Sequence, residues 1–137
     1  MKVSVIGMGY VGLSNAVLLS LKNNVVCHDI DTSKLESINK RVSPIKDDLI
    51  TSYFKHKKLK LTTSDYIDNE IATSDFIIIS TPTDFNAQKN IFNTSSIDVI
   101  LKKLNSLRSS ACLVIKSTLP IGYTKNMSHL YKKLKIY

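Results

Sequence analysis

The feature that most constrains the fold is a glycine pattern close to the N-terminus. An apolar run over residues 2–6 leads directly into Gly7-Met8-Gly9-Tyr10-Val11-Gly12, and a helical pattern follows over residues 13–21. A chain that passes this tightly from strand to helix needs residues without a Cβ atom. The first glycine permits the turn, the second lets a pyrophosphate approach the backbone, and the third lets the helix pack against the strand. Because a helix N-terminus also attracts phosphates, Gly7, Gly9, Tyr10, Val11 and Gly12 are expected to form a dinucleotide-binding loop.

A short β-rich run over residues 24–29 supplies the context that this motif requires. Asp29 lies about 20 residues after the glycine loop, where a carboxylate at the tip of the second strand accepts hydrogen bonds from an adenosine ribose. The alternative is that Asp29 only ends the strand or caps the next helix, a role that Asp31 is also placed to fill. We expect Asp29 to bind the cofactor.

Length and hydropathy favour one globular domain. A chain of 137 residues with 43% hydrophobic residues is long enough for a real core but short for a complete two-domain enzyme. No apolar run approaches the ~20 residues that span a bilayer. The glycine loop interrupts the apolar N-terminal stretch, so no signal peptide is expected. We therefore expect a cytoplasmic protein without a membrane partner.

The formal net charge of +8 is concentrated in two lysine-rich runs, residues 55–60 and 132–135. Such runs are usually solvated surfaces. The alternative, nucleic-acid binding, is disfavoured because the aromatic residues are scattered and no nucleic-acid motif is present. The sequence thus predicts no nucleic-acid partner.

Histidine and cysteine do not form a pattern typical of a metal site. His28, His56 and His129 have no metal-ligand spacing with one another or with the cysteines. Cys27 and Cys112 both lie in predicted strands, and a free cysteine usually behaves as a small buried hydrophobe. We expect no metal and two core cysteines.

The rest of the chain alternates between helical and strand-like patterns. Helices are expected over residues 31–40, 47–57, 65–72, 96–107 and 123–134, and strands over 59–62, 75–80 and 111–116. Ser33 and Glu36 have capping-box spacing near the start of the first of these helices. Strand and helix alternating on this scale indicate an α/β fold, a Rossmann-type doubly wound parallel sheet covered on both faces.

Ligands of such sheets bind beyond the carboxyl ends of the strands. Two predicted strands end in hydroxyl-rich segments, Ser80-Thr81-Pro82-Thr83 and Lys116-Ser117-Thr118-Leu119-Pro120. A proline just past each strand stops the ladder and fixes the turn, which leaves Thr83 and Thr118 free to face the cleft. The alternative is that both are ordinary loop threonines. The connection over residues 81–93 is long, and long loops at this end of a strand are often functional.

Several segments, in order along the chain, resemble one family. They are Gly-Met-Gly-Tyr-Val-Gly-Leu-Ser, Asp29-Ile30-Asp31, Ser43-Pro44-Ile45, Ser80-Thr81-Pro82-Thr83, Phe92-Asn93-Thr94-Ser95 and Ile115-Lys116-Ser117-Thr118-Leu119-Pro120-Ile121-Gly122. Together they resemble the amino-terminal NAD domain of the UDP-glucose/GDP-mannose dehydrogenase family over essentially the whole chain. The resemblance implies NAD as cofactor, with Val11, Asp29, Lys34, Thr83 and Thr118 as its contacts. Lys34, inside the following helix, is better placed for the diphosphate or an outer contact, and Thr118 is close to the reacting centre, where it helps hold water.

The resemblance also implies an activity. The family oxidises the primary alcohol of a nucleotide sugar to a carboxylate in two steps with two NAD molecules, and a cysteine thiolate captures the intermediate aldehyde. Residues matching the family's catalytic lysine, asparagine and cysteine are absent, because the sequence stops at Ile136-Tyr137, about where a sixth strand should begin. We expect residues 1–137 to be the NAD-binding Rossmann domain of a larger dehydrogenase, which binds NAD without catalysing and leaves the nucleotide sugar to the missing portion. UDP-glucose, oxidised to UDP-glucuronate, is favoured over UDP-N-acetylmannosamine or GDP-mannose.

A function of another class stays open. Regulatory nucleotide-sensing modules, such as the cytoplasmic domains that gate potassium transporters, are Rossmann domains of about this length. The long connection over residues 81–93 and the Ser117-Thr118 strand end argue against this alternative.

The C-terminal edge of the sheet raises a further expectation. The strand order 3-2-1-4-5-6 places strand six beside strand five, the strand over residues 111–116. With the chain ending at Tyr137, Leu113, Val114 and Ile115 should lose cover, and we expect a homo-oligomer through this edge or marginal solubility. The alternative is that Lys135-Ile136-Tyr137 folds back as a stub of strand six.

Overall fold

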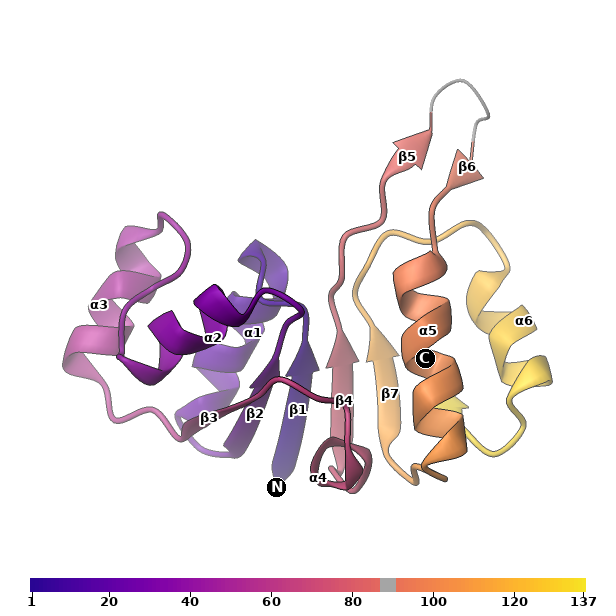
Figure 1. Ribbon diagram of the computed structural model, residues 1–137, viewed down its shortest axis with the longest axis horizontal. Coiled ribbons are helices and arrows are strands. Elements are labelled where there is room, and N and C mark those ends of the chain that lie inside the picture. Colours follow the sequence, from indigo (N-terminus) through magenta and orange to yellow (C-terminus); the bar gives the residue numbers. More distant parts are fainter. Residues whose placement is uncertain (87–90) are drawn as a thin grey trace.

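The computed structural model describes residues 1–86 and 91–137, and a parallel sheet lies at its centre (Figure 1). Among these residues, six strands pair in the order β3-β2-β1-β4-β7-β8, with every neighbouring pair parallel. The strands are β1 (Lys2–Ile6), β2 (Asn24–His28), β3 (Leu61–Ser64), β4 (Phe76–Ile79), β7 (Cys112–Ile115) and β8 (Lys135–Ile136). This order confirms the predicted Rossmann-type fold.

Helices cover both faces of the sheet. The structure has α1 (Tyr10–Ser20), α2 (Thr32–Asn39), α3 (Asp48–His56), α4 (Asn69–Ala72), α5 (Ser95–Ser106) and α6 (Tyr123–Leu130). In β1, Val3 and Val5 pack in the core that α1, α2 and α3 cover, whereas Ile6 packs in the core that contains α5 and α6. Because successive strand residues point to opposite faces, burial on both sides explains the nearly continuous apolar strands.

The long connection after β4 contains a small hairpin. β5 (Phe85–Asn86) and β6 (Ile91–Phe92) pair in antiparallel fashion and extend beyond the carboxyl ends of the strands (Figure 1). Residues 87–90 lie outside the described residues. The predicted loop over 81–93 is therefore partly ordered into strands.

Helix ends differ from the predicted ones where side chains cap the backbone. Asp31 is the N-cap of α2, and its Oδ1 accepts the Ser33 amide N–H at 3.1 Å, so the predicted capping box of Ser33 and Glu36 does not start this helix. Similarly, Asp68 caps α4, which begins four residues later than the predicted start at residue 65 because Oδ1 accepts the Glu70 amide at 2.9 Å.

The prediction that β7 is an uncovered edge is wrong. β8 pairs with β7 in parallel register, with Cys112 opposite Lys135 and Leu113 opposite Ile136. The Tyr137 amide donates to the Leu113 carbonyl at 2.8 Å, and the Ile115 amide donates to the Tyr137 carbonyl at 2.9 Å. The alternative of a folded-back stub of strand six is the observed arrangement. Because β7 is paired with β8, it offers no unpaired edge for self-association.

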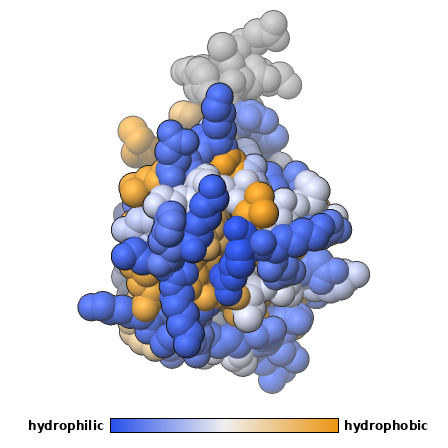
Figure 2. All heavy atoms as spheres, turned by 90° about the vertical axis from the view of Figure 1, so that its left-hand side faces the viewer, coloured by the Kyte–Doolittle hydropathy of each residue, from blue (hydrophilic) through white to orange (hydrophobic). Residues whose placement is uncertain are grey.

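The lysine-rich runs lie on the surface around buried leucines. Leu59 and Leu134 are each 5% exposed, while the lysines beside them are exposed: Lys55, Lys57, Lys58, Lys60, Lys132, Lys133 and Lys135. Figure 2 shows the side of the molecule that carries α3 as largely hydrophilic, with scattered apolar side chains. Within residues 1–86 and 91–137, no helix combines the length and apolar character needed to cross a membrane.

The two cysteines differ in environment. Cys27 is fully buried, and burial raises the pKa of its thiol to about 12, against an opposing effect of Arg41. Cys112 is only partly buried, so the expectation of two core cysteines holds for Cys27 and not fully for Cys112. Among the described residues, no cluster of histidine, cysteine or carboxylate side chains is arranged to hold a metal ion.

Candidate dinucleotide-binding site

The loop between β1 and α1 is built on close backbone contacts. Gly7 has a φ of 96°, which L side chains rarely adopt, and a Cβ there would lie 2.6 Å from the Ser80 carbonyl oxygen. At Gly12 a Cβ would lie 1.7 Å from the Gly7 carbonyl oxygen. At Gly9, by contrast, a Cβ would meet no atom of the described residues within 4 Å. Gly7 and Gly12 let the loop fold, and Gly9 leaves open space above the backbone.

Helix α1 starts from this loop without a side-chain cap. Gly9 is its N-cap, and the first turn contains no acidic residue. The first N–H groups of a helix lack intrahelical partners, and the positive end of the dipole lies among them. The start of α1 is therefore suited to an anionic group in the space above Gly9.

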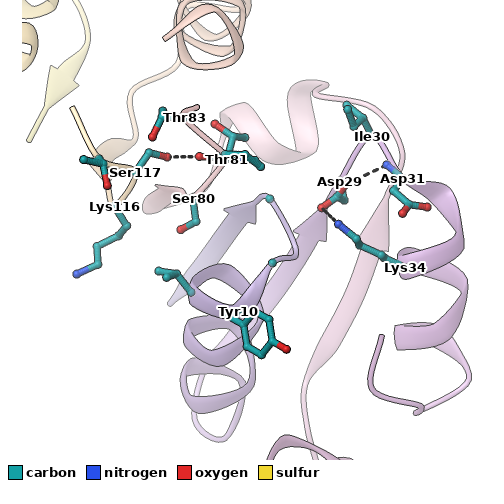
Figure 3. A pocket seen from close by; sticks show the side chains of 15 residues that line it. Tyr10, Asp29, Ile30, Asp31, Lys34, Ser80, Thr81, Thr83, Lys116 and Ser117 are labelled. Atoms are coloured by element: carbon teal, nitrogen blue, oxygen red, sulfur yellow. Dashed lines mark hydrogen bonds and ion pairs between the residues drawn. The ribbon is translucent and has the colours of Figure 1, made fainter. Parts of the chain in front are cut away.

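A cavity of about 530 Å³ opens at this point, beyond the carboxyl ends of the strands. Its volume is in the range of small-molecule sites, about 300–1,000 Å³. The lining residues are Gly7, Gly9, Tyr10, Val11, Asp29, Ile30, Asp31, Lys34, Ser80, Thr81, Pro82, Thr83, Lys116, Ser117 and Thr118 (Figure 3). All candidate residues from the sequence therefore meet in one cavity except Gly12, which is buried beside Gly7.

Asp29 lies at one end of the cavity and is only 8% exposed. Its Oδ2 accepts the Met8 amide N–H at 2.6 Å, and its Oδ1 accepts the Asp31 amide N–H at 2.9 Å. The Asp29 carboxylate thus holds the glycine loop in place, a contact that the sequence pattern did not reveal. Each carboxylate oxygen has two lone pairs, so Asp29 keeps capacity for a ligand.

Lys34 also lies at this end of the cavity, where its Nζ is 3.5 Å from Asp29 Oδ2 (Figure 3). The sequence-based expectation placed Lys34 nearer to a diphosphate or an outer contact. In the structure, the Lys34 ammonium lies beside the Asp29 carboxylate and neutralises part of its charge.

Ile30 and Asp31 complete the acidic end. Ile30 is 95% exposed and lines the cavity, so its side chain offers apolar surface to the flat face of a base. The Ser33 hydroxyl, which donates to Asp31, holds the pKa of that carboxyl below its usual value. Sequence reasoning did not single out Ile30; the signal was its place between two aspartates just past the strand tip.

The opposite end of the cavity carries hydroxyl groups from the loops after β4 and β7 (Figure 3). Ser117 Oγ donates to the Thr81 carbonyl oxygen at 2.6 Å and joins the two loops. Within the described part of the chain, neither Thr83 nor Thr118 forms a side-chain hydrogen bond, and both line the cavity. Their hydroxyls are therefore available to a ligand.

Ser80 lies between the two ends and has a buried hydroxyl oxygen without a hydrogen-bond partner in the described residues. A buried polar atom left without a partner costs about 1–3 kcal/mol. The uncapped start of α1, the open space at Gly9 and the Asp29 carboxylate together fit a dinucleotide.

A comparison with protein families agrees with this geometry. Residues 1–136 match the family model described as the UDP-glucose/GDP-mannose dehydrogenase family, NAD binding domain. The chain belongs to the UDP-glucose/GDP-mannose dehydrogenase family. It carries the NAD-binding domain of that family, so the predicted cofactor, NAD, is confirmed.

Two relatives of the family are similar over nearly the whole chain. The UDP-glucose 6-dehydrogenase of Campylobacter jejuni is 44% identical over 138 residues, covering 99% of this chain and 35% of the relative. The enzyme of the same name from Streptococcus pneumoniae is 40% identical over 136 residues, covering 99% of this chain and 34% of the relative. The chain thus spans about a third of the length of these relatives.

Solved structures of the family share the fold. The GDP-mannose dehydrogenase of Pseudomonas aeruginosa superimposes with a TM-score of 0.84 at 19% identity, over 99% of this chain and 35% of that one. The UDP-D-ManNAc dehydrogenase of Pyrococcus horikoshii gives a TM-score of 0.81 at 26% identity, over 96% of this chain and 32% of that one. The doubly wound sheet of this chain is therefore the NAD-domain architecture of its family.

Proposed function

We propose that residues 1–137 form one domain that binds NAD for the oxidation of a nucleotide sugar, with UDP-glucose as the favoured substrate. The observation that carries this proposal is the single cavity in which the glycine loop, Asp29, Thr83 and Thr118 meet. The identity of 44% and 40% to relatives named UDP-glucose 6-dehydrogenase supports UDP-glucose over other nucleotide sugars.

In this proposal the two ends of the cavity hold the two halves of NAD. The diphosphate lies over Gly9, Tyr10 and Val11, where the start of α1 offers free N–H groups. The adenosine ribose donates hydrogen bonds to Asp29, with Lys34 as an outer contact on the same carboxylate. This arrangement brings the nicotinamide half to the hydroxyl end.

At the hydroxyl end, Thr83 and Thr118 supply the polar contacts to the nicotinamide half. When bound, NAD supplies the hydride acceptor for oxidation of the sugar alcohol. Gly12 acts indirectly, because its missing Cβ lets α1 begin against Gly7. Ile30 provides the apolar surface for adenine.

We further propose that this chain by itself binds NAD but does not turn over substrate. Oxidation of a primary alcohol to a carboxylate transfers two hydrides to two NAD molecules, and water supplies the second carboxylate oxygen. Hydride transfer requires the sugar to be held at the nicotinamide, and capture of the aldehyde requires a nucleophile beside it. The resemblance to the family assigns these tasks to a lysine, an asparagine and a cysteine that have no counterpart among residues 1–137. Cys27 is buried in the sheet and is not placed to act as the nucleophile.

Calorimetric titration with NAD and with NADP tests the cofactor site. The Asp29 carboxylate can accept a hydrogen bond from the adenosine ribose of NAD but repels the 2′-phosphate of NADP. The loss of a charged hydrogen bond sets the scale of the preference at about 1–3 kcal/mol, and the nearby Lys34 ammonium should keep it near the lower limit. The matched variant Lys34→Ala should widen the preference for NAD. Equal affinity, or tighter binding of NADP, would contradict the role of Asp29.

Absorbance of NADH tests the second proposal. Purified chain supplied with UDP-glucose and NAD should form no NADH, whereas the full-length Campylobacter jejuni relative serves as the positive control. Steady NADH production by the chain, after removal of contaminating enzyme, would show that residues 1–137 carry more of the chemistry than proposed.

A further inference from the structure

We propose that Ser117, Thr81 and Ser96 form a hydroxyl brace that positions the nicotinamide end of the cofactor site. The inference rests on the proposed NAD site and adds positioning residues to it. The three members come from separate elements: Thr81 follows β4, Ser96 lies in the first turn of α5, and Ser117 follows β7. Two of them, Thr81 and Ser117, also line the cavity.

The first limb of the brace joins the loops after β4 and β7. Ser117 Oγ donates to the Thr81 carbonyl oxygen at 2.6 Å, and the bond crosses the hydroxyl end of the cavity (Figure 3). This distance lies within the usual range for an O–H···O bond, about 2.5–3.0 Å. The bond fixes the separation of two loops that belong to different strands.

The second limb ties the loop after β4 to α5. Thr81 Oγ1 lies 3.0 Å from Ser96 Oγ, and Ser96 Oγ donates to the Pro82 carbonyl oxygen at 3.3 Å. A serine hydroxyl has one hydrogen, so Thr81 must donate to Ser96 for both bonds to form. The Thr81–Pro82 segment is thus held from the side of β7 and from the side of α5.

The loop after β7 is anchored beyond Ser117 as well. Tyr123, in the first turn of α6, donates its hydroxyl hydrogen to Asp98 Oδ1 at 2.5 Å, and Thr94 Oγ1 donates to Asp98 Oδ2 at 3.1 Å. Burial, and then the contact with Asp98, raise the pKa of Tyr123, so the phenol keeps the proton that it donates. The start of α5 therefore supports both loops.

The brace matters because the side chains of Thr83 and Thr118, the proposed contacts of the nicotinamide half, are not held by hydrogen bonds of their own among the described residues. Thr118 follows Ser117 directly, and Thr83 lies two residues after Thr81. The brace fixes the backbone that carries both hydroxyls before the cofactor arrives. Such preorganisation improves affinity because less ordering remains to be done on binding.

A role in positioning can be separated from a role in folding by choice of ligand. ADP-ribose contains the adenosine, the diphosphate and the second ribose of NAD but not the nicotinamide. A brace that positions Thr83 and Thr118 should affect NAD and spare ADP-ribose. A brace that only stabilises the fold should affect both ligands alike.

The experiment is calorimetric titration of the whole 137-residue chain with NAD and with ADP-ribose. Ser117→Ala should raise the Kd for NAD about threefold to tenfold, the factor expected for one net hydrogen bond, and should change the Kd for ADP-ribose by less than about twofold. Ser117→Thr, which keeps the hydroxyl, should restore most of the affinity for NAD.

Ser128→Ala is the matched control, since Ser128 is also half-buried and its Oγ donates to a backbone carbonyl, that of Thr124, at 2.9 Å. It lies within α6, does not line the cavity, and should leave both Kd values unchanged. If Ser117→Ala fails to fold, Ser96→Ala cuts the second limb and is judged by the same two Kd values.

The outcomes distinguish failure of the brace from failure of the proposed NAD site. Equal losses for NAD and ADP-ribose, or an unchanged Kd for NAD in the folded variant, would overturn the brace while leaving the NAD site intact. A wild-type chain that binds neither ligand would contradict the proposed site itself, and the brace with it.

Discussion

Two glycines of the cofactor loop give opposite predictions when each is changed to alanine. Gly12→Ala places a Cβ 1.7 Å from the Gly7 carbonyl oxygen and 3.0 Å from the Gly7 carbonyl carbon, and neither backbone atom can rotate away. Gly9→Ala places a Cβ where no described atom lies within 4 Å. The backbone of Gly9, with φ −83° and ψ −167°, suits any residue.

The magnitudes follow from these distances. To relieve the contact in Gly12→Ala, α1 must move by more than about 1 Å within a packed core, and overpacking of this kind costs about 3 kcal/mol or more. The melting temperature should fall by about 10 °C for a chain of this size. Gly9→Ala should stabilise the fold by about 0.4–1 kcal/mol, because alanine has less freedom in the unfolded chain. The same Cβ obstructs the diphosphate and should weaken NAD binding by about tenfold or more, or about 1.4 kcal/mol.

Thermal and urea unfolding, combined with NAD titration of each folded variant, check both effects. Gly9→Ala with wild-type affinity for NAD would show that the diphosphate does not approach the loop at this residue. Gly12→Ala with wild-type stability would show that α1 has room at its start that the structure does not have.

Further predictions concern the residues that hold the site and the sheet. Asp29→Ala leaves the buried Met8 amide without its acceptor and should lower the free energy of unfolding, measured in urea, by about 1–3 kcal/mol. Asp29→Asn keeps an acceptor oxygen and should lower it by less. Equal losses in the two variants would contradict the observed contact. Burial raises the pKa of the Cys27 thiol to about 12, so in a folded Cys112→Ser variant this thiol should resist alkylation by iodoacetamide at about pH 8. It should react after unfolding in guanidinium, and prompt reaction of the folded protein would contradict its burial. Ile136→Lys places a charge at a position that is 7% exposed and should detach β8 from β7. Because β7 then becomes an unpaired edge, sedimentation should show stronger self-association than in the wild type. An unchanged sedimentation profile would argue against β8 as the cover of β7.

The sequence by itself determined the sheet and the two ends of the candidate site, because both depend on local patterns. The glycine spacing reflects backbone needs within one loop, a positive φ at Gly7 and a close approach at Gly12. Asp29 could be placed because it directly follows β2 in a fold whose ligands bind at strand ends. The apolar runs of β1 and β4 indicated burial on both faces, which a parallel sheet between two helix layers requires.

Only the tertiary structure decided which side chains meet. The contact of Asp29 with Met8 spans 21 residues, and that of Ser117 with Thr81 spans 36. The contact of Lys34 with Asp29 is closer in sequence but depends on how α2 packs against the strand tip. The pairing of β8 with β7 removed the edge that the chain length had suggested. Periodicity reports the face on which a residue lies, whereas these partners depend on the crossover geometry and packing that bring separate strand ends together.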